Sequence, residues 1–179
     1  MRCSIRGLAA LAAVLALLAT GAAARAAEEV PAKFRVGDTA PDFTLRDLDG
    51  REVRLSAFAG DKVVLLNFWS LRCGACLSEI PHLNRILKNY AGRKVAVISV
   101  LTDGVDAAAS TTIMKEVGAA PAYPVLVDQE FAVSDAYTNF VVPFTLVIDR
   151  KGIVRFVHTG FEPGTEKQYE TALDKALGS

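Results

Sequence analysis

The feature that most limits what this chain can fold into is a continuous apolar run that ends just before a pair of cysteines. Residues 62–69 read Lys-Val-Val-Leu-Leu-Asn-Phe-Trp, which has the length and composition of a strand buried on both faces of a sheet. Cys73 and Cys76 follow, and then apolar residues recur at helical spacing: Leu77, Ile80, Leu83, Ile86 and Leu87. The two cysteines therefore lie where a tight turn leads from a central strand into a helix, which we expect to end near Tyr90.

The rest of the chain alternates between strand and helix patterns. A hairpin is predicted over 42–55, with its turn at Asp47-Leu48-Asp49-Gly50, and a second one over 144–158. Further strands are predicted at 95–101 and 125–127, and helices at 106–117, 131–137 and 165–177. This order of elements indicates an α/β domain.

The N-terminus has the layout of a signal peptide. Residues 1–6 carry two arginines, 8–18 are apolar without a charge, and 22–27 are small residues around Arg25. We therefore assign 1–26 to a signal peptide, 27–35 to a linker and 36–179 to the folded domain, which is periplasmic or otherwise extracytoplasmic. The alternative is an uncleaved membrane anchor, because the apolar stretch is almost long enough to span a bilayer, and it would be the only contact with the membrane.

The number of cysteines favours redox chemistry. Removal of the leader takes Cys3 with it and leaves two thiols three positions apart. A structural disulfide closing so small a ring would add little stability, and a zinc site would need two more ligands, which neither His82 nor His158 offers at a suitable spacing. Lysine plus arginine number 20 and aspartate plus glutamate number 20, so no charge excess suggests nucleic acid as a partner.

A thiol at the start of a helix is easier to ionise than a thiol in water. The helix N-terminus carries about half a positive elementary charge and several unpaired backbone N–H groups. The thiolate is the nucleophile in thiol-disulfide exchange. We therefore predict that Cys73 attacks and that Cys76, one turn further along the same side of the helix, resolves the mixed disulfide.

Four motifs carry a family resemblance in their order and spacing: residues 36–43 (Val-Gly-Asp-Thr-Ala-Pro-Asp-Phe), 67–69 (Asn-Phe-Trp), 73–76 (Cys-Gly-Ala-Cys) and 142–145 (Val-Pro-Phe-Thr). Together they resemble the TlpA/ResA-like branch, of redoxin or AhpC/TSA type, of the thioredoxin superfamily. The resemblance covers nearly all of the mature chain. It implies a thioredoxin fold: a central mixed β-sheet flanked by helices, with an N-terminal β-hairpin and a short β-α insertion.

The resemblance also implies an activity. Members of this branch are extracytoplasmic thiol-disulfide oxidoreductases that act on protein disulfides or thiols and need no cofactor. Their usual direction is reduction, for example of apocytochrome c cysteines or copper-site cysteines, with electrons arriving from a membrane thiol transporter. The sequence alone does not fix the direction of electron flow, because redox poise depends on a few kcal/mol of relative thiolate stability.

The resemblance assigns roles to residues around the cysteines. Pro143, preceded by Val142, resembles the cis-proline that faces the disulfide and pairs its backbone with an extended substrate. Glu79 resembles the glutamate that relays protons for the buried thiol; the alternative is a solvated acid in the first helical turn. Trp69 packs beside the site, where it either contacts the substrate directly or serves as a core aromatic.

Asn67 sets this branch apart from ordinary thioredoxins, and the sequence departs from the branch in two respects, the residue before Cys73 and the dipeptide between the cysteines. Asn67 stands where ordinary thioredoxins have a buried aspartate, so their proton relay is not expected here. Arg72 precedes the first cysteine, where tryptophan is common, and Gly74-Ala75 separates the two thiols without a proline. Arg72 either favours the Cys73 thiolate by charge attraction or is a solvated surface residue.

Two rival functions share this kind of domain. A thioredoxin-fold peroxidase would need a threonine and a proline just ahead of its reactive cysteine, and residues 68–72 supply neither. A copper-site assembly or chaperone module, the rival that is not an enzyme, typically spaces its cysteines CxxxC and adds a histidine. The CxxC spacing disfavours this second rival.

Overall fold

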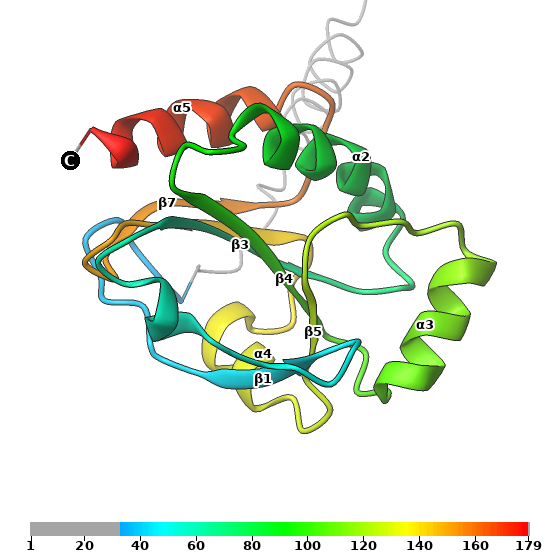
Figure 1. The fold of residues 1–179 in the computed structure, drawn as a ribbon. Coiled ribbons are helices and arrows are strands. Elements are labelled where there is room, and N and C mark those ends of the chain that lie inside the picture. Colours follow the sequence, from blue (N-terminus) through cyan, green and yellow to red (C-terminus); the bar gives the residue numbers. More distant parts are fainter. Residues whose placement is uncertain (1–32, 179) are drawn as a thin grey trace, which may run out of the picture. The chain divides into compact units, whose positions relative to one another are not determined.

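The computed structural model describes residues 33–178, so the predicted leader and all but the last three residues of the predicted linker lie outside the described part. Seven strands form one sheet in the order β2-β1-β5-β4-β3-β6-β7 (Figure 1). The strands are β1 (Thr44–Asp47), β2 (Glu52–Arg54), β3 (Val63–Trp69), β4 (Val95–Leu101), β5 (Val125–Val127), β6 (Phe144–Ile148) and β7 (Val154–Thr159).

Four α-helices and a short 3-10 helix accompany the sheet in the described residues: η1 (Leu55–Phe58), α2 (Gly74–Asn89), α3 (Ala107–Glu116), α4 (Ala132–Thr138) and α5 (Glu166–Leu177). The predicted elements agree with these bounds to within a few residues. Among residues 33–178, no helix combines the length and the apolar character that crossing a membrane would require.

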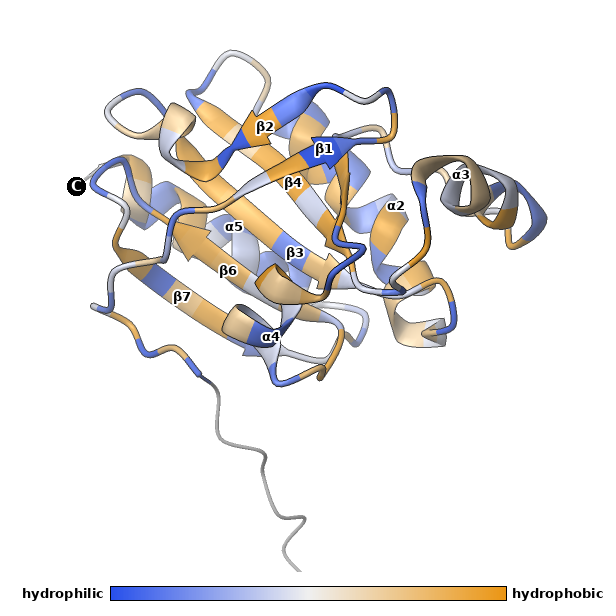
Figure 2. Ribbon diagram, turned by 90° about the horizontal axis from the view of Figure 1, so that it is seen from below, coloured by the Kyte–Doolittle hydropathy of each residue, from blue (hydrophilic) through white to orange (hydrophobic). Residues whose placement is uncertain are grey.

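Strand β3 is the centre of the sheet, as its apolar sequence predicts. It pairs in parallel with β4 and antiparallel with β6, and all seven of its residues are buried. Figure 2 shows that the central strands are hydrophobic along most of their length. The sheet is therefore mixed and covered on both faces.

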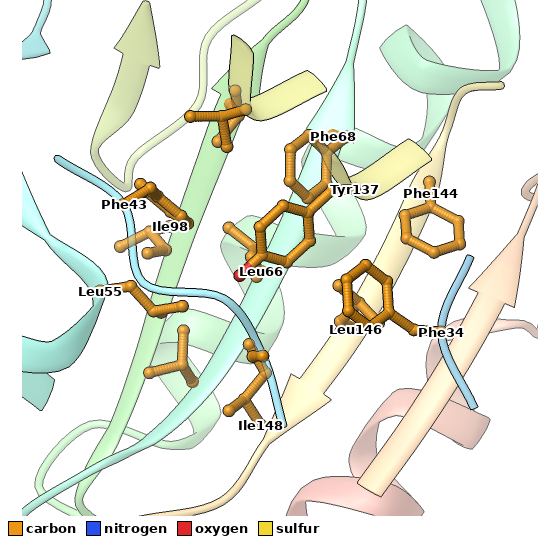
Figure 3. Close-up of a cluster of buried hydrophobic side chains, with 14 of the residues drawn as sticks. Phe34, Phe43, Leu55, Leu66, Phe68, Ile98, Tyr137, Phe144, Leu146 and Ile148 are labelled. Carbon is orange, nitrogen blue, oxygen red and sulfur yellow. The ribbon is translucent and has the colours of Figure 1, made fainter. Parts of the chain in front are cut away.

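The residues of β3 alternate between the two faces of the sheet. Its even-numbered residues join one buried cluster, in which Tyr137 of α4 stacks on Phe68 with ring centroids 5.1 Å apart (Figure 3). Val63 and Leu65 join a second cluster with residues of α2 and α5. Helices α2 and α5 thus cover one face and α4 the other, as Figure 1 shows.

The thioredoxin fold is confirmed, including its two additions. Strands β1 and β2 form the N-terminal hairpin, whose turn is held by Asp47 Oδ1, which accepts from the backbone N–H groups of Asp49 and Arg51. Strand β5 and helix α4 form the short insertion. Strand β5 pairs in parallel with β4 and antiparallel with β1, so the insertion joins the hairpin to the central sheet.

The packed core includes a residue from the segment assigned to the linker. Phe34 lies inside the segment 27–35 assigned to the linker, but its ring is buried and packs 5.0 Å from that of Tyr137. The backbone N–H of Gly37 donates to Val154 O at 2.8 Å, which fixes this segment against the start of β7. A single aromatic residue in a charged stretch was the signal that the core begins earlier.

Candidate active site

The two cysteines lie at the junction predicted for them. Strand β3 ends at Trp69, and Cys73 is the N-cap of α2, where its Sγ accepts a hydrogen bond from the backbone N–H of Cys76 at 3.1 Å. Cys73 is half-buried and Cys76 is buried. The pair forms a disulfide, so the structure shows the oxidised form. The more accessible sulfur is the one at the positive end of the helix dipole.

The turn between β3 and Cys73 is anchored by an acid that sequence analysis missed. Asp103 Oδ1 accepts from Ser70 Oγ at 2.9 Å, and Asp103 Oδ2 accepts from the backbone N–H of Leu71 at 2.8 Å. The signal was available, because β3 and β4 are parallel neighbours and the residues after each strand meet at one edge of the sheet. Asp103 therefore fixes the approach to the cysteines.

A second loop faces Cys73 from the start of β6. The peptide bond between Val142 and Pro143 is cis, as the resemblance implies. Val142 O lies 3.8 Å from Cys73 Sγ, and Pro143 O accepts from the backbone N–H of Gly160 at 2.8 Å, which ties this loop to the end of β7. The loop places a backbone carbonyl directly beside the more accessible sulfur.

Glu79 is buried in the second turn of α2. Its side chain is 1% exposed, so the alternative of a solvated acid in the first turn is wrong. Three donors reach its carboxylate: Tyr169 Oη at 2.7 Å and Thr145 Oγ1 at 3.4 Å donate to Oε1, and Asn67 Nδ2 at 3.0 Å donates to Oε2. Glu79 follows Cys76 by three residues, so both side chains lie on the same face of α2.

The environment of Glu79 brings its proton equilibrium close to neutral pH. Burial raises the pKa of Glu79 to about 7, and the hydrogen bonds from Tyr169, Asn67 and Thr145 offset part of that increase. In the described part of the chain no lysine, arginine or histidine forms an ion pair with this carboxylate. A carboxyl group with such a pKa can both take up and release a proton at neutral pH.

A row of polar residues crosses the sheet beneath Glu79. Asn67 of β3 is directly opposite Thr145 of β6 on one side and Ser99 of β4 on the other, and Thr145 is in turn opposite His158 of β7. Asn67 Nδ2 also donates to Thr145 Oγ1 at 3.0 Å. Asn67, Ser99 and Thr145 are the polar exceptions in apolar strands, which was the sequence signal for this row.

The structure decides between the alternatives for Trp69 and places Arg72 on the surface. Trp69 is a core aromatic: it is 1% exposed, shares a buried cluster with Cys76, and donates from Nε1 to Ser99 Oγ at 3.2 Å. Arg72 is exposed, and its side chain makes no ion pair with another residue of the described range. Trp69 therefore supports the site from within, and Arg72 is an exposed charge that precedes Cys73 in the chain.

The structure thus brings Cys73, Cys76, Glu79, Asn67 and the Val142–Pro143 loop together, and adds Tyr169, Thr145 and Asp103. Tyr169 could not be found from local sequence, because it belongs to α5, the last helix of the chain. Within residues 33–178, no three His, Cys, Asp or Glu side chains gather in an arrangement suited to a metal ion.

Comparisons with known proteins agree with this geometry. The model of the AhpC/TSA family matches residues 36–157. The thiol-disulfide oxidoreductase ResA of Geobacillus thermodenitrificans is 36% identical over 125 residues, which cover 70% of this chain and 70% of that relative. The thioredoxin-like protein YneN of Bacillus subtilis is 34% identical over 77% of this chain and 78% of its own length.

A similar solved structure is that of a protein from Chlorobium tepidum assigned as a thiol:disulfide interchange protein DsbE. It superimposes with a TM-score of 0.73 at 29% sequence identity and covers 81% of this chain and 99% of its own. The relatives and this solved structure are named as thioredoxin-like or thiol-disulfide proteins, which is consistent with the fold of this chain and with its disulfide at the start of α2.

Proposed function

This chain belongs to the AhpC/TSA family, and we propose that it is a thiol-disulfide oxidoreductase that acts on protein disulfides outside the cytoplasm. The observation that carries the proposal is the position of the Cys73–Cys76 disulfide, at the N-terminus of α2 and beside the carbonyl of Val142. A sulfur at this place is accessible, favoured as a thiolate and next to a backbone with which an extended substrate can pair.

The reaction runs in two exchanges when the protein acts as a reductase. The Cys73 thiolate attacks one sulfur of the substrate disulfide, the substrate S–S bond breaks, and one substrate thiolate leaves. Cys76 then attacks Cys73 Sγ, which forms the internal disulfide and releases the second substrate thiolate. The substrate gains two electrons and the protein loses them, so the step needs no cofactor.

Glu79 acts as the proton acceptor for Cys76. The second exchange requires the thiolate of Cys76, which is buried and therefore hard to ionise. A carboxylate three residues further along the helix, with a pKa of about 7, is matched to this proton transfer. The buried position and the elevated pKa of Glu79 support this role over a purely structural one.

Reduction is the physiological direction that we propose. The protein would pass electrons from a membrane thiol donor to protein substrates, for example in cytochrome c maturation. The support is the resemblance to the ResA-like branch and the relatives named thiol-disulfide oxidoreductase ResA. The signal-peptide pattern of residues 1–26 supports the extracytoplasmic location.

Reduction of insulin tests the proposal against its rivals. We expect the reduced protein to cleave the disulfides of insulin, the Cys73→Ser variant to be inactive, and hydrogen peroxide to oxidise the reduced protein far more slowly than insulin does. Rapid peroxide consumption would favour the peroxidase, and copper retained after dialysis would favour the copper module. Failure of the wild-type protein to reduce any disulfide would contradict the proposal.

A further inference from the structure

Tyr169 reaches the active-site glutamate from the far end of the chain. It belongs to α5, is 0% exposed, and donates from Oη to Glu79 Oε1 at 2.7 Å, the shortest of the three hydrogen bonds to that carboxylate. Its ring packs edge-on against Phe156 and His158 of β7, with centroid distances of 5.9 and 6.0 Å. The phenol is therefore held in one place by packing as well as by its hydrogen bond.

The phenol of Tyr169 is a permanent donor. Burial and the neighbouring Glu79 carboxylate raise the pKa of Tyr169 well above its usual range, so it keeps its proton throughout the physiological range. A donor that cannot ionise stabilises the carboxylate form of Glu79 relative to the carboxylic acid. The hydrogen bond also fixes the rotamer of a side chain that otherwise has three rotatable bonds.

We propose that Tyr169 is a positioning residue for disulfide exchange: its hydrogen bond favours the carboxylate form of Glu79 and holds that carboxylate one helical turn from Cys76, so that Glu79 can take the thiol proton. This inference rests on the proposed function and extends it to a residue of α5. Helix α5 thus contributes to the chemistry of a disulfide on α2.

The step that Tyr169 supports is the second exchange. The proton of the Cys76 thiol moves to the Glu79 carboxylate, and the resulting thiolate attacks Cys73 Sγ in the mixed disulfide. The bond from Cys73 to the substrate sulfur breaks, and its electron pair leaves with the substrate thiolate. Tyr169 changes neither its protonation nor its bonding partners; it sets how readily Glu79 accepts the proton.

Several other titratable groups lie around Tyr169 and Glu79. Cys76 lies on α2, and His158 of β7 packs edge-on against Tyr169, with its pKa lowered by burial. Tyr123, just before β5, has a buried hydroxyl without a hydrogen-bond partner among the described residues, and burial and the charge of Glu79 raise its pKa. Glu166 of α5 pairs instead with His82 and Arg85. Within the described residues, Glu79 is therefore the acid at the centre of this cluster.

The two exchanges can be followed separately with the chromogenic disulfide 5,5′-dithiobis(2-nitrobenzoate). In stopped flow, the reduced protein releases one thionitrobenzoate when Cys73 attacks and a second one when Cys76 resolves the mixed disulfide. For Tyr169→Phe, we expect the acid limb of the pH profile of the second phase to move upward by about one pH unit, because Glu79 loses a charge-assisted donor. The first phase should be unchanged.

Tyr90→Phe is the matched control. Tyr90 is also buried between α2 and α5, but its hydroxyl donates to the backbone carbonyl of Glu170 at 3.0 Å, and its loss should leave both pH profiles in place. Replacing Tyr169 with 3-fluorotyrosine keeps the packing while strengthening the donor, and should move the limb downward. It serves as the test if Tyr169→Phe does not fold.

The outcomes separate this inference from the proposed function. A protein that shows neither phase would not exchange disulfides at all, and both would fail. The positioning role of Tyr169 would be overturned if both Tyr169 variants showed two normal phases and the acid limb of the second phase did not move. An equal shift of that limb in Tyr90→Phe would overturn it as well. Either result would leave the oxidoreductase assignment intact. A limb that moves in opposite directions in the two Tyr169 variants supports the inference.

Discussion

The side-chain amide of Asn67 donates to Glu79 Oε2 over 3.0 Å in a part of the interior where both side chains are buried. An amide at this position gives Glu79 a donor without adding a second ionisable group. The carboxylate of Glu79 therefore has no like-charged neighbour on β3 and can titrate as a single acid. This pairing distinguishes the site from one that has an aspartate on the central strand.

Replacing Asn67 with aspartate should create a pair of competing carboxyl groups. Two buried carboxylates within hydrogen-bond distance cannot both be ionised, so one must keep a proton at neutral pH. We expect Asn67→Asp to lower the free energy of unfolding at pH 8 by about 3 kcal/mol. Near pH 4, where both carboxyl groups can be protonated, the loss of unfolding free energy should be much smaller. Urea unfolding at the two pH values measures this. An equal loss at both would contradict the role of Asn67 as a neutral donor.

Glu79 should make the folded state less stable as the pH rises. Its pKa is about 7 in the folded protein and near the ordinary 4.5 when unfolded, so between these values the folded state binds more protons. The free energy of unfolding should fall across this window by about 3 kcal/mol because of this one group.

The variant Glu79→Gln isolates that contribution, because every other titratable group is common to both proteins. Relative to wild type, the oxidised variant should gain stability between pH 4.5 and 8 in urea unfolding experiments. A stability difference that stays constant with pH would show that the Glu79 carboxyl has an ordinary pKa.

Asp103 should control the order of the turn that leads to Cys73. Asp103→Ala removes the acceptor for Ser70 Oγ and for the Leu71 amide, and we expect a loss of about 1–3 kcal/mol of stability, because a part-buried N–H loses its partner. Hydrogen exchange of the Leu71 amide should accelerate and insulin reduction should slow.

Asp106→Ala is the control for this change. Asp106 caps α3 by accepting from the backbone N–H of Ala109 at 2.8 Å, so its loss costs about 1 kcal/mol but leaves the turn before Cys73 intact. Equal effects of the two variants on exchange at Leu71 would mean that Asp103 acts only through general stability.

Arg72 should have a small effect on the redox potential. Its charge favours the thiolate, and therefore the reduced form, but the side chain is exposed and screened. We expect Arg72→Gln to make the reduction potential more negative by about 5–20 mV at low salt, with the difference vanishing in about 1 M salt. A potential that is unchanged or less negative at low salt would contradict any contribution from this charge.

Local sequence predicts the elements of this fold well because each has its own pattern. The apolar run of β3, the helical spacing after Cys76 and the turn at Asp47 are all signals within a few residues. The burial of Glu79 is different: it depends on which face of α2 meets the polar row formed by Asn67 and its strand neighbours. Only strand register and helix packing bring these side chains together.

Tyr169 shows most clearly what sequence cannot supply. It lies 90 positions from Glu79 along the chain, and its helical pattern alone indicates only that it faces the core. That it meets a carboxylate there, rather than another apolar residue, follows from how α5 docks beside α2. Asp103 is an intermediate case, since the parallel pairing of β3 and β4 would have placed it near the turn.

The most direct test of the account is to trap the mixed disulfide. A Cys76→Ser variant lacks the resolving thiol, so after reaction with a disulfide-containing protein it should remain covalently linked through Cys73, as peptide mass spectrometry can establish. The Cys73→Ser variant should trap nothing. The opposite result would be an adduct on Cys76 in the Cys73→Ser variant and no adduct on Cys73 in the Cys76→Ser variant. That result would reverse the two roles and contradict the assignment of Cys73 as the attacking thiol.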